Sequence, residues 1–214
     1  MTTSSKDRAQ RRCEKSRSTG ETNITVSIDL DGSGHSSVST GLPFFDHMLD
    51  QIARHGGFDL TVKAEGDLHV DSHHTVEDSA ILLGECFKEA VGDKSGVRRF
   101  ASGLFPLDEA LVEVALDLSG RPFFVWDVEL PESLPLGSPP FDPQLAEHIF
   151  QSFATAADIT LHIRMRSGRN VHHIVEAAFK GLGRCLRDAV FVQSNSIPST
   201  KGSLAVQAES APEV

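Results

Sequence analysis

The stretch His73-His74-Thr75-Val76-Glu77 recurs later in the chain as His172-His173-Ile174-Val175-Glu176. Each copy opens a run of apolar residues at helical spacing, so each is predicted to begin a helix. In a helix, residues four apart share a face, whereas adjacent residues diverge by roughly 100°. The first histidine and the glutamate of each pentad can therefore hold one metal ion, while the second histidine points elsewhere. One copy alone would be weak support against a solvated helix face. Two copies indicate a duplicated chain that binds metal.

The segments that lead to each pentad also repeat. The predicted elements of the first repeat, residues 21–107, are strands at 22–30, 35–39, 58–64 and 67–70 and helices at about 45–53 and 73–92. The second repeat, residues 108–203, is predicted to have strands at 110–118, 121–130 and about 158–161, a helix opened by Asp142-Pro143, and a pentad helix capped by Asn170. Each helix has one apolar side to bury. We therefore expect an α+β fold of internally duplicated strand-strand-helix-strand-helix units, related by a pseudo-two-fold repeat, with sheets covered by helices.

Composition limits the classes of function. A formal net charge of -10 at pH 7 argues against a general nucleic-acid or membrane-surface binder, and we expect neither partner. No stretch approaches the roughly 18 apolar residues of a membrane span. Cys13, Cys86 and Cys185 are odd in number and form no C-x-x-C pair, which suits a reducing compartment. A cytoplasmic protein is expected.

The two ends of the chain differ from its centre. Residues 1–20 carry Lys and Arg among Ser and Thr, with almost nothing apolar, and are predicted to be a disordered basic tail. Because an apolar core is missing, a secretory signal is excluded. A plastid-type transit segment stays an alternative, against which Asp7 and Glu14 count. Residues 204–214 are predicted to be a second disordered tail.

Aligning the two repeats groups the candidate metal ligands. His47 corresponds to His148, and the two pentads correspond residue by residue. Symmetry allows the histidine and glutamate of each pentad to be completed by two histidines of the other repeat. The first predicted set is His73, Glu77, His148 and His173, and the second is His172, Glu176, His47 and His74. Three nitrogens and one oxygen suit a first-row divalent ion, but this donor set does not choose among Mn, Fe, Co, Ni and Zn.

Basic residues offer candidate sites for an anion. They are Arg98-Arg99, Arg121 after Ser119-Gly120, Lys180 one turn beyond Glu176, and the loop at 198–202. Arginine binds anions through a planar fork, lysine as a point charge, and a Ser/Gly loop through its backbone N–H groups. Each of these residues alone is more often a solvated surface cation. They gain weight only because they accompany the metal ligands.

Other polar residues are given ordinary roles. We expect a group of carboxylates to cap helices or to orient the ligands rather than to catalyse: Asp46, Asp78 and Asp108-Glu109. Three histidines lack a suitable repeat partner and are treated as ordinary strand residues: His35, His69 and His162.

Five motifs occur in a characteristic order, at residues 41–49 (GLPFFDHML), 71–78 (DSHHTVED), 117–122 (DLSGRP), 170–180 (NVHHIVEAAFK) and 198–202 (PSTKG). Together they resemble the signatures of the imidazoleglycerol-phosphate dehydratase family, and the resemblance covers about residues 20–203. The departures are Leu107, where the family's Pro-Met-Asp-Glu segment has methionine, and Gln144, where an acid is common. Neither position is a predicted ligand.

The resemblance implies a lyase of histidine biosynthesis that converts imidazole glycerol phosphate to imidazole acetol phosphate and water. It implies two Mn²⁺ ions per active site, which stabilise an imidazolate and so help to expel the hydroxyl group, with other first-row divalent metals left open. It also implies a 24-subunit shell with metal sites at subunit contacts. The catalytic residues it implies are Glu21, His47, His73, His74, Glu77, His172, His173 and Glu176, with Glu21 as an acid/base group. The substrate contacts it implies are Glu21, Gln51, His55, Arg99, Arg121, Lys180, Ser199 and Lys201.

Two other functions compete with this one. A dinuclear metal phosphatase would also use histidines, carboxylates and arginines, and would release inorganic phosphate. A metal-storage or structural protein would keep the metal ligands but would not need Arg99, Arg121 and Lys201.

Overall fold

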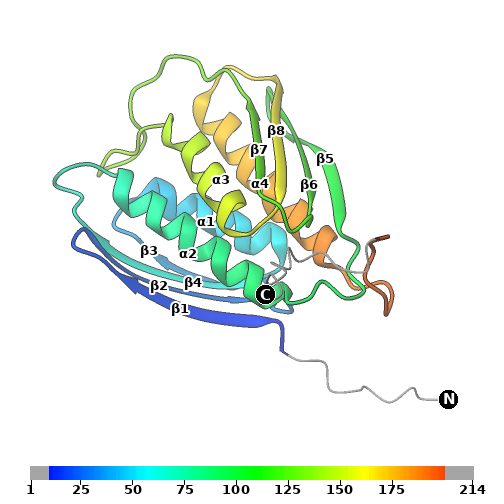
Figure 1. The fold of residues 1–214 in the computed structure, drawn as a ribbon. Coiled ribbons are helices and arrows are strands. Elements are labelled where there is room, and N and C mark those ends of the chain that lie inside the picture. Colours follow the sequence, from blue (N-terminus) through cyan, green and yellow to red (C-terminus); the bar gives the residue numbers. More distant parts are fainter. Residues whose placement is uncertain (1–9, 201–214) are drawn as a thin grey trace, which may run out of the picture.

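The computed structural model describes residues 10–200 (Figure 1). The first half contains β1 (Arg12–Ser18), β2 (Thr22–Asp29), β3 (Ser36–Ser39), α1 (Pro43–Gly56), β4 (Asp59–Gly66) and α2 (His73–Val91). The second half contains β5 (Phe100–Leu107), β6 (Ala110–Asp117), β7 (Phe123–Asp127), α3 (Leu145–Ala156), β8 (Thr160–Ser167) and α4 (Val171–Val190). The same order of element types therefore occurs twice, and none of the helices described here could span a membrane.

The two sheets have the same topology. Their strand orders are β1-β2-β4-β3 and β5-β6-β8-β7. In each sheet the last pair, β3 with β4 and β7 with β8, is parallel, and the other pairs are antiparallel. This correspondence confirms the duplicated α+β fold that the sequence predicts.

The helices lie between the two sheets (Figure 1). Helix α2 packs on β1 and β2, and α1 packs on β3; in the second repeat, α4 packs on β5 and β6, and α3 packs on β7. The two helix layers then meet through α1 against α4 and α2 against α3. Each helix–helix contact thus joins one helix from either repeat. Within the described part of one chain, these helix contacts bring side chains of the two repeats together.

Buried side chains show the duplication in detail. In β2 and β6, alternate residues face the helices and are buried, as expected for strands that pack on one side. The Cys86 thiol of α2 donates a hydrogen bond to the Val26 carbonyl, and the Cys185 thiol of α4 donates to the Val114 carbonyl, both with a sulfur–oxygen distance of 3.6 Å. The two cysteines therefore fix equivalent helices to equivalent strands.

Local signals set the ends of the helices. Pro43 is the first residue of α1, and Gly57 ends it in the left-handed conformation, with φ of 66°. The Asn170 side chain caps α4 by accepting a hydrogen bond from the His173 backbone N–H at 3.4 Å, as predicted. Helix α3 begins at Leu145 rather than at Pro143, because the turn before it is closed by a Leu145 N–H bond to the Asp142 carbonyl.

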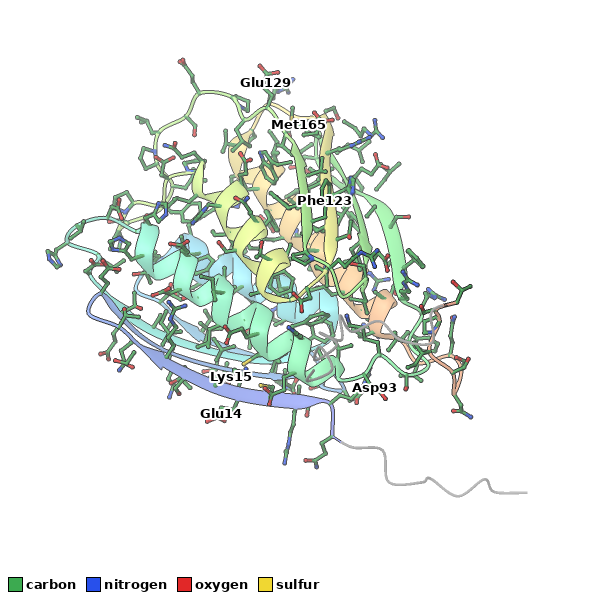
Figure 2. The ribbon with its side chains drawn as sticks, in the orientation of Figure 1. Glu14, Lys15, Asp93, Phe123, Glu129 and Met165 are labelled. Atoms are coloured by element: carbon green, nitrogen blue, oxygen red, sulfur yellow. The ribbon has the colours of Figure 1, made fainter. Side chains whose placement is uncertain are left out.

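The prediction that residues 1–20 form a disordered tail is wrong for residues 12–18, which form β1. This strand pairs with β2 along its whole length, and Cys13 is buried beneath α2. Lys15 and Glu14 lie on opposite sides of β1 (Figure 2), and the Lys15 ammonium lies 3.2 Å from Glu89 of α2. The basic residues that suggested a tail thus belong to an edge strand. Residues 1–9 and the predicted tail at 204–214 lie outside the described residues.

The predicted boundary between the repeats, at residues 107 and 108, is also wrong. Strand β5 pairs with β6 and belongs to the second sheet, so the second repeat begins before Phe100. Each repeat consequently opens with an additional strand that the predicted order lacks. The predicted strand at 67–70 is instead a turn, closed by a Val70 N–H bond of 2.7 Å to the Asp67 carbonyl.

Candidate metal centre

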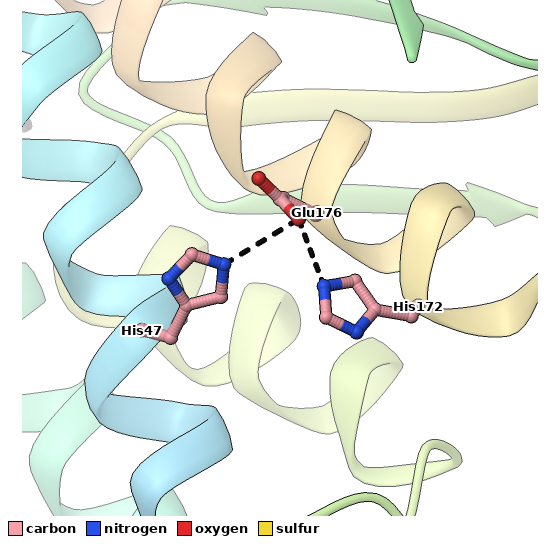
Figure 3. Close-up of side chains that lie close together, drawn as sticks. All are labelled: His47, His172 and Glu176. Carbon is pink, nitrogen blue, oxygen red and sulfur yellow. Dashed lines mark hydrogen bonds and ion pairs between the residues drawn. The ribbon is translucent and has the colours of Figure 1, made fainter. Parts of the chain in front are cut away.

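The first ligand group lies where α1 meets α4. Its members are His47 of α1 and His172 and Glu176 of α4 (Figure 3). Glu176 Oε2 lies 2.9 Å from His172 Nε2 and 3.4 Å from His47 Nε2. One oxygen and two ring nitrogens therefore converge from two helices, one from each repeat.

The second ligand group lies where α2 meets α3. Its members are His73 and Glu77 of α2 and His148 of α3. Glu77 Oε1 lies 3.1 Å from His148 Nε2, and Glu77 Oε2 lies 3.8 Å from His73 Nε2. This arrangement repeats the first group with the roles of the two repeats exchanged. An open pocket of about 430 Å³ between α2 and α3 adjoins Glu77 and His148.

The donor atoms of both groups fit a divalent metal ion. In each group they lie within 4.8 Å of one another, and imidazole nitrogen with carboxylate oxygen suits a first-row divalent metal. His148 Nε2 is buried and has no hydrogen bond to any other described residue, even though a Glu77 oxygen lies 3.1 Å away. A buried nitrogen of this kind needs a partner, and a metal ion would supply one.

The electrostatics keep Glu176 ionised. Burial opposes its charge, but the hydrogen bond and the positive charge of Lys180, together with His172 and His47, lower the pKa of the carboxyl group. The Lys180 ammonium lies 2.7 Å from Glu176 Oε1, which leaves Oε2 directed at the histidines. Glu176 therefore offers a charged ligand oxygen.

The second histidine of each pentad lies outside both groups. His74 Nδ1 lies 3.0 Å and 3.2 Å from the two carboxylate oxygens of Asp67. His173 Nδ1 lies 2.8 Å from Glu109 Oε2. One chain thus brings together three of the four predicted ligands of each set.

The basic candidates are distributed around the second repeat. Arg99 binds Asp117 through two nitrogens, at 2.7 Å and 3.0 Å, and donates to the Pro198 carbonyl at 2.8 Å. Arg121 is exposed at the start of the β7 segment, next to the buried Ser119. The Ser199 backbone N–H donates to the Ile197 carbonyl at 2.8 Å. Lys201 lies outside the described residues.

Three further predicted residues lie on α1 or before β2. Gln51 is buried one turn after His47, and its Nε2 lies 3.3 Å from His47 Nδ1. His55 is half-buried, and burial, followed by the charges of Lys180 and Arg184, lowers its pKa. Glu21 Oε2 lies 3.8 Å from His74 Nδ1.

Comparison with known proteins decides the family. The family model described as imidazoleglycerol-phosphate dehydratase matches residues 40–186, which contain both ligand groups. The chain belongs to this family.

Members of the family from several organisms are similar over nearly their full length. The chain is 54% identical to the imidazoleglycerol-phosphate dehydratase of Parafrankia sp. over 190 residues, which cover 88% of this chain and 96% of that protein. It is 53% identical to the protein of the same name from Dinoroseobacter shibae, over 91% of this chain and 100% of that protein. It also resembles the crystal structure of the Staphylococcus aureus enzyme, with a TM-score of 0.76 and 33% identity over 85% of this chain and 99% of that one. The Pyrococcus furiosus structure, solved in complex with (S)-C348, gives a TM-score of 0.74 with 37% identity, and the match covers 88% of this chain and 99% of that one.

Asp67 is the site residue of this family member that sequence reasoning missed. Glu109, which was predicted to cap a helix or to orient a ligand, hydrogen-bonds to His173. Asp46 and Asp78 also act as anchors: Asp46 accepts from the Thr40 backbone and hydroxyl groups, and Asp78 accepts from the Thr22 hydroxyl at 2.6 Å. Asp67 lies in the turn that was predicted to be a strand, and no repeat partner marked it.

Proposed function

We propose that the protein is an imidazoleglycerol-phosphate dehydratase, a hydro-lyase of histidine biosynthesis that converts imidazole glycerol phosphate to imidazole acetol phosphate and water. The observation that carries the proposal is the pair of ligand groups, each with two imidazoles and one carboxylate, in a chain of this family. In the reaction the substrate loses a hydroxyl group and a carbon-bound proton, which leave as water. The enol that forms then becomes the ketone.

Two metal ions fit the two groups, and Mn²⁺ is the ion we propose. His47, His172 and Glu176 would hold one, and His73, Glu77 and His148 the other. Such ions would supply Lewis-acid chemistry that favours loss of the ring proton and departure of the hydroxyl group. The two ions would also fix the orientation of the ring.

His74 and His173 would complete the ligand sets in a neighbouring copy of the chain. Both lie outside the ligand groups of their own chain. Each nevertheless belongs to a repeated pentad whose first histidine and glutamate are members of those groups. Sharing ligands between copies makes metal binding depend on assembly, and we propose the 24-subunit shell of the family. His74 would add to the set of His172, and His173 to the set of His73.

The remaining predicted residues would handle the proton and the phosphate. Glu21 is proposed as the acid/base group, because its side chain is 55% exposed and lies close to a proposed ligand, His74. Gln51 and His55 line the same face of α1 as His47 and would contact the substrate. The phosphate would bind to basic residues and to the loop beyond β8 and α4: Arg99, Arg121, Lys180, Ser199 and Lys201.

The decisive experiment is an assay of the purified, metal-free protein with imidazole glycerol phosphate, with and without added Mn²⁺. Formation of the acetol phosphate only with Mn²⁺ is expected. A folded, metal-loaded protein without turnover would contradict the proposal. Release of inorganic phosphate instead would point to the phosphatase. Metal binding with no change in substrate affinity in Arg121→Ala would favour metal storage.

A further inference from the structure

The two repeats place a glutamate at the same position, directly before their second strand. Glu21 precedes β2 and Glu109 precedes β6. Each glutamate lies near the second histidine of the pentad in its own repeat. A duplicated pair would be expected to make the same contact twice.

The two contacts differ. Glu109 Oε2 lies 2.8 Å from His173 Nδ1, which is a hydrogen bond, whereas Glu21 Oε2 lies 3.8 Å from His74 Nδ1, which is beyond hydrogen-bond range. In the first repeat, the hydrogen bond to His74 comes from Asp67 instead, at 3.0 Å and 3.2 Å.

The position of Asp67 explains the exchange. Asp67 directly follows β4, and the residue that directly follows β8 is Gly168, which has no carboxylate. The Asp67 backbone N–H donates to the Glu21 carbonyl at 3.1 Å, so the two acids are held side by side. Asp67 is the more enclosed of the two, since its side chain is 17% exposed and that of Glu21 is 55% exposed.

We propose that Asp67 and Glu109 are positioning residues, which hold His74 and His173 in the tautomer and orientation that metal binding requires. This inference rests on the proposed function. A carboxylate that accepts the Nδ1 proton leaves the Nε2 lone pair as the metal ligand and fixes the plane of the ring. In the first repeat, Asp67 has taken over this task from the glutamate, and Glu21 is left free to contact the substrate.

The neighbouring contacts separate the two residues experimentally. Glu109 also accepts the backbone N–H groups of Asn170 at 2.8 Å and Arg169 at 3.2 Å, so it also stabilises the start of α4. Among residues 10–200, in contrast, the hydrogen bonds of the Asp67 carboxylate are both to His74. Substituting Asp67 is therefore the cleaner test of a positioning role. Substituting Glu109 tests the equivalent role in the second repeat.

The test measures Mn²⁺ affinity in assembled, full-length protein in which only one ligand set is intact. His148→Ala disables the set of His73, and His47→Ala disables the set of His172. In the His148→Ala background, Asp67→Ala should weaken Mn²⁺ binding by roughly 10–100-fold, the usual cost of losing a carboxylate behind a metal-bound histidine. In the His47→Ala background, the same change should leave the affinity unaltered. Glu109→Ala should show the reverse pattern.

Two matched variants control for folding. Asp67→Asn keeps an oxygen that accepts the Nδ1 proton and should recover part of the affinity, while Glu14→Gln removes an exposed carboxylate on the outer side of β1 and should change nothing. Equal weakening of both sets by Asp67→Ala, or unchanged affinity in both, would overturn the inference.

These results remain distinct from those that test the proposed function. If the unaltered protein bound two Mn²⁺ ions but had no dehydratase activity, the proposed function would fail and the crossed titrations would still decide the role of Asp67. If it bound no Mn²⁺, both proposals would fail.

Discussion

Lys180 Nζ lies 2.7 Å from Glu176 Oε1, one turn further along α4. Burial by itself would raise the pKa of the Glu176 carboxyl group, and the contact with Lys180 opposes this effect by lowering the pKa. A proposed phosphate contact thus also holds a proposed metal ligand in its charged form.

Replacing Lys180 should therefore shift metal binding along the pH scale. In the unaltered protein, the lowered pKa of Glu176 keeps the carboxylate available below its ordinary titration range, and its contribution to stability is lost only as the pH falls through that lowered value. Lys180→Ala removes the lowering effect of the ammonium group while burial remains. The pKa of Glu176 should therefore rise, and Mn²⁺ should be released at a higher pH during acid titration. Lys63→Ala, on the exposed side of β4, is the control. Identical release curves for the two variants would contradict this role of Lys180.

Two glycines set the distance between the helices that carry the ligands. A Cβ atom at Gly84 would lie 2.7 Å from the Phe153 carbonyl oxygen of α3, and one at Gly183 would lie 2.9 Å from the Ile52 carbonyl oxygen of α1. Backbone cannot move aside as a flexible side chain can, so each substitution must push two helices apart.

Gly84→Ala and Gly183→Ala should each destabilise the protein by about 1–3 kcal/mol, the typical cost of overpacking. Each should also weaken Mn²⁺ binding, because α2–α3 and α1–α4 are the contacts across which the ligands meet. Urea unfolding and metal titration measure the two effects. Gly20→Ala, where a Cβ atom would meet nothing within 4 Å, should be neutral. If both helix variants bound Mn²⁺ with wild-type affinity, metal binding would not depend on the spacing of these helices.

The duplication explains which parts of the site can be predicted from the sequence. The pentads and the match of His47 with His148 are visible as repeated motifs. Helix geometry and repeat symmetry predict from them the residues that the structure brings together in each group. Asp67 has no such signal, since it directly follows β4 and the residue that directly follows β8 is Gly168. Its role depends on a turn whose contact with His74 appears only in three dimensions.

Strand β1 shows a second limit of the sequence pattern. An edge strand on a helix-covered sheet buries only one side, and here Cys13 is its one fully buried apolar residue. Its basic side chains are instead neutralised by acids of α2, such as Glu89 with Lys15 and Asp78 with Arg17. Composition alone could not separate such a strand from a tail, because the acids that neutralise it lie far away in the sequence.

The cysteines should be inert while the protein is folded. Burial raises the pKa of the Cys185 thiol to about 12 and raises the pKa of Cys86 and Cys13 as well. At pH 8 roughly one Cys185 in 10⁴ is then a thiolate, the form that reacts. Iodoacetamide at pH 8, followed by mass spectrometry, should find all three unmodified in the native protein and all three alkylated in guanidinium. Rapid alkylation of Cys185 in the native protein would mean that the contact between α4 and β6 opens readily.

Arg99 combines a fixed conformation with a fixed position. It has a positive φ of 76°, its guanidinium group is held by Asp117, and its NH1 reaches the Pro198 carbonyl of the loop that contains Ser199. If this loop binds the phosphate, Arg99 both supplies charge and places the loop. Arg99→Ala should then raise KM for imidazole glycerol phosphate by roughly 10–100-fold, as expected for the loss of a charge-assisted hydrogen bond of ~1.5–3 kcal/mol.

The neighbouring Arg98, whose guanidinium lies 5.9 Å from the centre of the Phe191 ring, is the matched control, and Arg98→Ala should leave KM nearly unchanged. Steady-state kinetics with saturating Mn²⁺ measure both variants, and an equal rise in KM would show that general positive charge, rather than the fixed position of Arg99, attracts the substrate.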